Sequence, residues 1–262
     1  MADTDVVASW DAVSAAYQER YEIPIATIHL GPMVPCTAEL GIELDVAGRR
    51  VLDFGCGGGQ NAVACGLSGA AAVVGVDPSR RQLDSARSLA GRAGVTVEFR
   101  DLSHAGLTDL LGTIDIVLSV YAMQFVADIR ATLAWIAALL RPGGILVLSV
   151  DHPVRLAGEW RDDEFIIEDY FVGGWQSWPY DFPEAGLQVT MRRFRRTTAE
   201  WVDAVLAAQF TLRRLCEPLP PEVPDSFGRK SKYGTDDSRN VFNRDKLQRV
   251  PGTLILVAER AI

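Results

Sequence analysis

The sequence predicts an α/β fold, a doubly wound and mostly parallel seven-stranded sheet with helices on both faces. Short apolar runs alternate with helical patterns from residue 49 onward, and a glycine-rich stretch, 55–59, follows the first run. The runs stay apolar along their length, as strands do when helices cover both faces of a parallel sheet. We therefore expect an N-terminal helical cap, a Rossmann-like core, an aromatic-rich insertion after the fifth strand and a C-terminal part of the sheet, over residues 1–45, 46–150, 151–190 and 191–262.

Seven short apolar runs are the expected strands. The run 71–77 ends in an acidic residue, and Pro142, Gly143 and Gly144 turn the chain into the run 145–150. Two further runs after the insertion finish the sheet. In chain order, strands are expected at 49–54, 71–77, 95–99, 114–120, 145–150, 210–215 and 253–259.

Capping residues and apolar spacing locate the helices between these runs. Ser79 with Gln82 is a possible capping box at the start of one helix, which Gly91 can end. Thr197 and Glu200 open the helix after the insertion. The side chains expected on the buried helix faces are Val6, Trp10, Val13 and Tyr17, then Leu83, Ala86, Leu89 and Ala90, then Ile129, Leu133, Ile136 and Leu140, and finally Val202, Val205 and Leu206.

Composition and charge narrow the class of protein. Of the 262 residues, 48% are hydrophobic and 23% are charged, which is ordinary for a soluble globular protein. The net charge of -8 argues against binding of nucleic acid, because such binding depends on clustered positive charge. The four cysteines show no C-x-x-C or metal-binding spacing, so no metal is expected. The N-terminus does not resemble a signal peptide and no apolar run is long enough to span a membrane. We expect a cytoplasmic monomer or homodimer.

The stretch VLDFGCGGGQ, residues 51–60, predicts a ligand site, because glycines bring backbone close to a ligand at the start of a helix. Two cofactor classes fit. The spacing Gly57-x-Gly59-x-x-Ala62, with Asp77 further on, matches a nicotinamide-dinucleotide fingerprint. Asp53 argues against it, because a carboxylate there would repel a pyrophosphate but could meet an ammonium group. Asp101, just after the third strand, could accept from an exocyclic amine.

Five segments together resemble the class I, seven-stranded Rossmann-like S-adenosylmethionine-dependent methyltransferases. They are VLDFGCGGG, VVGVDPS, RDLS, IDIVLSVYAMQFV and LLRPGGILVLSV, and they cover about residues 45–150. The resemblance implies that Asp53 and the backbone of Gly55, Gly57 and Gly59 approach the methionyl moiety. It also implies that Asp77, beside Pro78, binds the ribose hydroxyls, that Asp101 and Leu102 meet the adenine, and that Ser119 lines the methionine side.

A narrower resemblance covers HLGPMVP, SVDHPV, FRRTTAEW and CEPLPPE. These segments are similar to a bacterial subgroup of small-molecule methyltransferases, several of which tailor natural products. Gln124 and Arg195 stand where histidines are common in that subgroup. The resemblance implies methylation of a small acceptor, with oxygen ahead of carbon and nitrogen as the acceptor atom. A nicotinamide-dependent oxidoreductase and a cofactor-binding protein without catalysis are the alternatives.

Three histidines are candidates for proton transfer. His152 follows the fifth strand and could take a proton from a phenol or alcohol, although a histidine before a proline can equally shape a loop. His29, in the N-terminal cap, is the second candidate, against a structural turn. His104 is expected on the adenine side or at the surface.

Acceptor-binding residues are expected from the cap and the insertion. Tyr17 and Tyr21 could close over the cofactor or simply anchor the cap, and Gln124 follows the fourth strand. Arg195 or Arg196 could hold an acceptor carboxylate, phosphate or phenolate, unless this basic run is a solvated face. The insertion could form an aromatic lid or merely pack on the core; its aromatic residues are Trp160, Phe165, Tyr170, Phe171, Trp175, Trp178, Tyr180 and Phe182.

Overall fold

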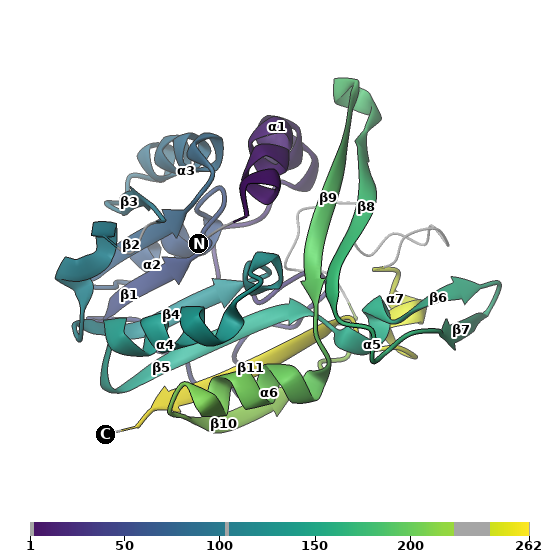
Figure 1. The fold of residues 1–262 in the computed structure, drawn as a ribbon. Helices are drawn as coiled ribbons and strands as arrows, with labels where there is room; N and C mark the ends of the chain where they lie inside the picture. The colour runs from purple at the N-terminus through teal and green to yellow at the C-terminus, as the bar shows by residue number, and fades with distance from the viewer. Residues whose placement is uncertain (1–2, 103–104, 223–241, 262) are drawn as a thin grey trace.

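The computed structural model describes residues 3–102, 105–222 and 242–261, and it contains the predicted seven-stranded sheet (Figure 1). The strand order is β10-β11-β5-β4-β1-β2-β3. The five strands β5, β4, β1, β2 and β3 are parallel to one another. Strand β11 runs antiparallel to both β5 and β10. The predicted fold class is therefore confirmed. The strands are β1 Arg50–Phe54, β2 Ala72–Asp77, β3 Glu98–Asp101, β4 Ile114–Val120, β5 Leu140–Asp151, β10 Phe210–Cys216 and β11 Thr253–Arg260.

Helices cover both faces of the sheet. On one face, α4 and α6 pack Leu133, Ile136 and Val205 onto the strands. On the other face, α2 and the segment 28–46 contribute a second apolar cluster, which includes Ala62. The helices are α1 Thr4–Tyr21, α2 Gln60–Leu67, α3 Arg80–Ala93, α4 Ile129–Leu139, α5 Pro153–Leu156, α6 Thr198–Ala207 and α7 Arg244–Leu247, with short 3₁₀ helices η1 Ala105–Leu110, η2 Met123–Phe125 and η3 Pro183–Ala185.

Several predicted boundaries move by a few residues. Helix α3 runs past Gly91 and ends at Gly94, whose left-handed backbone (φ 67°) closes the helix. The following turn delays β3 to residue 98 instead of 95. The predicted capping box at Ser79 is only half formed: Ser79 accepts from the Gln82 backbone, but the Gln82 side chain bonds Gln18 instead.

Helix α6 begins with the predicted cap, but one of its side chains expected to be buried is exposed. Thr197 and Glu200 form a complete capping box. Val205 is buried as expected, but Leu206 is 48% exposed because it turns away from the sheet.

The insertion after β5 consists of two antiparallel hairpins, β6 Gly158–Arg161 with β7 Glu164–Ile167, and β8 Gly174–Phe182 with β9 Leu187–Arg195. Figure 1 shows the β8–β9 hairpin standing beyond the edge of the sheet with α1 beside it, while β6–β7 projects away to the side. Strand β9 continues to Arg195, five residues beyond the expected end of the insertion at residue 190.

Helix α1 is fastened to the β8–β9 hairpin along its length. The Tyr180 hydroxyl donates to the Tyr21 hydroxyl at 2.8 Å, and Ser9 Oγ donates to the Thr190 carbonyl at 3.0 Å. Arg192 pairs with both Asp3 and Asp5 near the start of the helix, at 3.3 and 3.0 Å. The helix and the hairpin therefore form one cover over the carboxyl edge of the sheet.

Replacement of Gly59 by alanine should destabilise the fold more than the same change at Gly94. Both glycines have left-handed backbones, at φ 82° and 67°, which cost an alanine roughly 1–2 kcal/mol. A Cβ at Gly59 would also lie 2.7 Å from the Ala86 Cβ, and such overpacking adds roughly 1–3 kcal/mol. A Cβ at Gly94 meets no described atom within 4 Å. Denaturant unfolding of the two variants measures the difference, and equal losses would contradict the packing argument.

Candidate functional site

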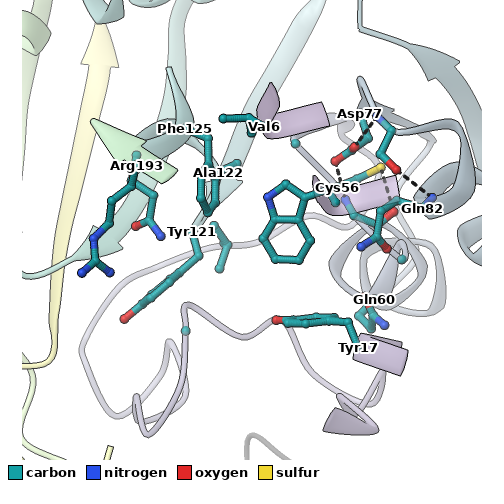
Figure 2. A pocket seen from close by; sticks show the side chains of 18 of the residues that line it. Val6, Tyr17, Cys56, Gln60, Asp77, Gln82, Tyr121, Ala122, Phe125 and Arg193 are labelled. Atoms are coloured by element: carbon teal, nitrogen blue, oxygen red, sulfur yellow. Dashed lines mark hydrogen bonds between the residues drawn. The ribbon is translucent and has the colours of Figure 1, made fainter. Parts of the chain in front are cut away.

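A cavity of about 1040 Å³ lies at the carboxyl edge of the sheet, under α1 and the β8–β9 hairpin. Strand ends and loops form its floor, including Asp53, Asp77, Tyr121 and Asp151. Figure 2 shows Asp77, Cys56 and Gln82 at one side of the cavity and Tyr121 and Arg193 at the opposite side. The first side holds the carboxylates of Asp53 and Asp77, whereas the second holds two guanidinium groups, Arg155 and Arg193, around the Asp151 carboxylate.

The glycine loop after β1 is held against β2 and leaves one glycine facing open space. The backbone N–H groups of Gly55 and Cys56 donate to the Val76 carbonyl at 2.8 and 2.9 Å. Gly57 has φ 50° and donates to Asp77 Oδ2 at 2.9 Å, and no described atom lies within 4 Å of a Cβ placed there. A ligand can therefore approach the backbone at Gly57. At Gly55 a Cβ would lie 2.3 Å from the Ala122 Cβ, so that glycine serves close packing.

Two buried carboxylates beside this loop have no cationic partner among the described residues. Asp53 is 2% exposed, its Oδ2 makes no hydrogen bond, and burial raises its pKa to about 7. Asp77 is 9% exposed and accepts from the backbone of Gly57 and Ser79; burial still raises its pKa to about 6. A buried carboxylate without a partner is costly, and a ligand with positive charge or hydroxyl donors would satisfy it.

Helix α1 covers this carboxylate side of the cavity. Gln18 Nε2 donates to Gln82 Oε1 at 2.9 Å and Gln18 Oε1 accepts from Gln60, so three amides join α1 to α2 and α3. Trp10 of the same helix packs edge-on against Tyr17 and Phe125, with ring centroids 5.2 and 5.5 Å apart. The apolar rings therefore lie between the acidic and the basic sides.

The residues predicted to bind the cofactor fall into two groups. Three of them face away from the cavity. Gly59 packs on Ala86, Ser119 Oγ donates to the Phe54 carbonyl at 3.0 Å, and the exposed Asp101 lies 3.6 Å from Arg80. Those that line the cavity are Asp53, Gly55, Gly57, Asp77, Pro78 and Leu102.

The two candidate bases differ in their surroundings. His152 is 1% exposed and does not line the cavity: its Nδ1 accepts from the Val154 backbone at 3.2 Å, and its Nε2 lies 2.8 Å from Glu217 Oε1. Burial lowers its pKa, and Glu217 opposes that shift. His29 does line the cavity, and the Asn61 amide fixes its backbone. Burial lowers the pKa of His29 to about 4, so its imidazole is neutral near pH 7. His104 lies outside the described residues.

Of the predicted acceptor-binding residues, Tyr17, Tyr21 and Gln124 line the cavity. Gln124 is fixed by Asp151, whose backbone N–H it accepts at 2.8 Å and whose Oδ2 it donates to at 3.1 Å. Gln124, which the narrower resemblance singled out, therefore lies in the cavity wall and is held there by Asp151.

The other predicted acceptor-binding residues serve the scaffold. Both Nη atoms of Arg195 donate to Asp169 at 2.7 Å, and Arg196 Nη2 donates to the Val126 and Ala127 carbonyls. Trp175 packs against Phe194 and does not line the cavity. Neither arginine is a solvated side chain, since both are more than nine-tenths buried.

Asp151, Tyr121 and Arg193 line the cavity but were not predicted as site residues, whereas Trp178 was expected as part of the aromatic insertion. Asp151 ends β5 and accepts from both Arg155 and Arg193, and Tyr121 has a left-handed backbone (φ 55°) with its hydroxyl 2.6 Å from Thr253 Oγ1. Trp178 lies under the Arg193 guanidinium. The acidic residue that ends β5, as Asp77 ends β2, was the available signal.

The described residues contain neither a metal-binding cluster nor a membrane-spanning helix. No group of three or more His, Cys, Asp or Glu side chains in residues 3–102, 105–222 and 242–261 is arranged to hold a metal ion. None of the helices in these ranges is long and apolar enough to cross a membrane.

The sequence of the chain is similar to those of methyltransferases. The methyltransferase domain family matches residues 36–213. The ubiquinone biosynthesis O-methyltransferase of Rhizobium johnstonii is 38% identical over 111 residues, which cover 42% of this chain and 44% of that protein. The match thus spans less than half the length of this curated relative.

Solved structures share the fold over most of the chain. An S-adenosylmethionine-dependent methyltransferase from Mesorhizobium loti superposes with a TM-score of 0.65 at 23% identity, covering 85% of this chain and 96% of that one. A putative S-adenosylmethionine-dependent methyltransferase from Listeria monocytogenes gives a TM-score of 0.66 at 23% identity, over 86% and 96%.

Asp53→Asn should stabilise the ligand-free protein, increasingly as pH rises. An unfolded chain releases this proton near pH 4, whereas the folded chain holds it until about pH 7. Folding stability therefore falls as pH rises from about 4 to 7, and asparagine removes that dependence. The gain at pH 8 should be at most about 4 kcal/mol, since the shift spans about three pKa units and one unit corresponds to about 1.4 kcal/mol.

Denaturant unfolding at pH 5 and pH 8 tests this, with Asp84→Asn on the exposed side of α3 as the control. If the difference in free energy of unfolding between the parent and Asp53→Asn does not grow with pH, the Asp53 carboxylate does not cause the loss of stability.

Proposed function

The chain belongs to the methyltransferase domain family, and from that premise we propose that it transfers a methyl group from S-adenosylmethionine to a small-molecule acceptor. The acceptor group is a hydroxyl of an apolar or aromatic metabolite. One observation carries the proposal: a single covered cavity joins buried carboxylates that have no cationic partner among the described residues, at a glycine loop, to a half lined with aromatic side chains. Tailoring of a natural product, a cytoplasmic location and a monomer or homodimer stay predictions from the sequence.

The carboxylate half fits the cofactor. S-adenosylmethionine, when bound, supplies an electrophilic methyl group on a sulfonium. Asp53, whose Oδ2 is buried without a hydrogen bond, would meet the positive charge of the methionyl part. Asp77 would accept from the ribose hydroxyls, and the open backbone at Gly57 leaves room for close approach. Pro78 and Leu102 would flank the adenosine, since both line this side of the cavity.

The other half orients the acceptor and excludes water. Methyl transfer is an in-line displacement, so alignment of the reactants supplies most of the rate, roughly 7–11 kcal/mol of the barrier in favourable cases. Tyr121, Trp178, Tyr180 and Met191 surround the acceptor side, and α1 with the β8–β9 hairpin closes over it. A cavity with so much apolar surface holds the nucleophile away from bulk water.

His29 would either take the proton of the acceptor hydroxyl or accept a hydrogen bond from that hydroxyl. It lines the cavity as a neutral imidazole, whereas the ring nitrogens of His152 are engaged by Val154 and Glu217 outside the cavity. The proposal therefore places His29 ahead of His152 in proton handling, which reverses the order expected from the sequence.

The curated relatives support oxygen as the acceptor atom, since the matched Rhizobium protein is named as an O-methyltransferase. The match covers 111 residues, 44% of that protein, so carbon or nitrogen acceptors stay as alternatives. A nicotinamide-dependent reaction has less support, because Asp53 lies buried beside the loop where a pyrophosphate would have to bind.

Asp77→Ala should lower the affinity for S-adenosylhomocysteine by about 100-fold or more, because two charge-assisted hydrogen bonds to the ribose would be lost. Asp101→Ala should leave the affinity unchanged, because that exposed side chain faces Arg80. Calorimetric titration compares the two variants, and thermal unfolding verifies that both are folded. Parental affinity in Asp77→Ala would overturn the cofactor assignment.

His29→Ala should lower kcat by on the order of 100-fold, the lower end for a positioned base, while His152→Ala should stay within about threefold of the parent. At saturating cofactor, kcat of the parent should be flat from about pH 6 to 9, because the His29 pKa of about 4 lies below this range. An acceptor is first identified by incubating metabolite fractions with isotopically labelled methyl donor. A large loss in His152→Ala with none in His29→Ala would reverse the assignment.

A further inference from the structure

Arg193 is a cationic side chain that lines the cavity and is held there by described residues. It lies on β9 opposite Gln176, and its Nε donates to Gln176 Oε1 at 3.0 Å. Its Nη1 donates to Asp151 Oδ2 at 3.1 Å, and its guanidinium stacks 4.5 Å from the centre of the Trp178 ring. Two contacts from β8 and one from the end of β5 therefore hold the group in one orientation.

These contacts use only part of the guanidinium. Nη2 of Arg193 makes no hydrogen bond to the described residues, although the side chain lines the cavity and is only 16% exposed. An arginine carries five N–H donors in a planar fork, and that geometry matches a carboxylate. One edge of the fork is thus available to a molecule in the cavity.

The negative charge beside Arg193 is shared. Asp151 also accepts from Arg155 and from Gln124 Nε2, so its single carboxylate serves three donor groups. Burial lowers the pKa of Arg193 to about 10, so the group is still charged at neutral pH. A buried cation with only a share of one carboxylate leaves room for a second anion.

We propose that the acceptor is a small aromatic or apolar acid whose carboxylate binds the free edge of Arg193. The surrounding side chains, Tyr121, Trp178 and Met191, fit an aromatic or apolar body for this acid. The inference rests on the proposed function, because it assigns the acceptor half of the same cavity. It moves the anion-binding role from Arg195 and Arg196, which bond Asp169 and backbone carbonyls, to Arg193.

Paired probes test the charge requirement directly. Benzoate and benzamide have the same size, but only benzoate carries the anion. Each is titrated calorimetrically into the protein saturated with S-adenosylhomocysteine. Benzoate should bind about 10-fold or more tightly than benzamide, because a hydrogen bond between charged groups is stronger than one to a neutral amide.

Variants assign the effect to one residue. Arg193→Gln should lower benzoate affinity by about 10-fold or more and leave benzamide binding nearly unchanged. Arg193→Lys keeps the charge but loses the fork, and should give an intermediate loss. Arg213→Gln on the exposed edge strand β10 is the control and should match the parent. Thermal unfolding shows that each variant is folded, and the benzoate-to-benzamide ratio of the parent tests the proposal even if Arg193→Gln does not fold.

Equal affinities for the two probes, no binding of either, or parental benzoate binding in Arg193→Gln would overturn the inference. The titration with S-adenosylhomocysteine is read separately. If that ligand fails to bind while benzoate binding depends on Arg193, the proposed function fails and the anion site stands.

Discussion

The carboxylates at the carboxyl edge of the parallel sheet set the constraint on which the remaining structure depends. Asp53 lies in β1, and Asp77 and Asp151 end β2 and β5, all largely buried. A buried carboxylate needs a compensating charge or donors. Asp151 receives two guanidinium groups and an amide, whereas Asp53 and Asp77 receive only backbone N–H groups. The carboxylate at the end of β5 therefore has cationic partners, whereas those of β1 and β2 have none among the described residues.

This division explains why the insertion follows β5. Its second hairpin brings Arg193 to the Asp151 carboxylate, and that ion pair joins β9 to the end of β5. The hairpin then holds α1 through Tyr180 and Thr190, and α1 in turn covers the glycine loop. Charge compensation at one strand end thus positions the cover over another.

The sequence predicted the elements whose signals are local, and missed those that depend on pairing. Asp53 and Asp77 were found because a strand, an acid and a glycine loop follow one another in the chain. Which arginine of the run 192–196 faces the cavity depends on the pairing of Gln176 with Arg193, and no local pattern gives that register. The role expected for Ser119 stays a prediction: its hydroxyl bonds the Phe54 carbonyl between two strands, a contact that no local pattern indicates.

Helix α1 is attached in two chemically different ways. Near its start, Asp3 and Asp5 pair with Arg192, and such ion pairs weaken as salt screens them. Near its end, Gln18 is held by the neutral amides of Gln60 and Gln82, which ionic strength and pH leave largely untouched. A rise in ionic strength should therefore weaken the ion pairs at the start of the helix more than the amide contacts at its end. The cover over the glycine loop thus depends less on salt than the contact between the start of α1 and β9.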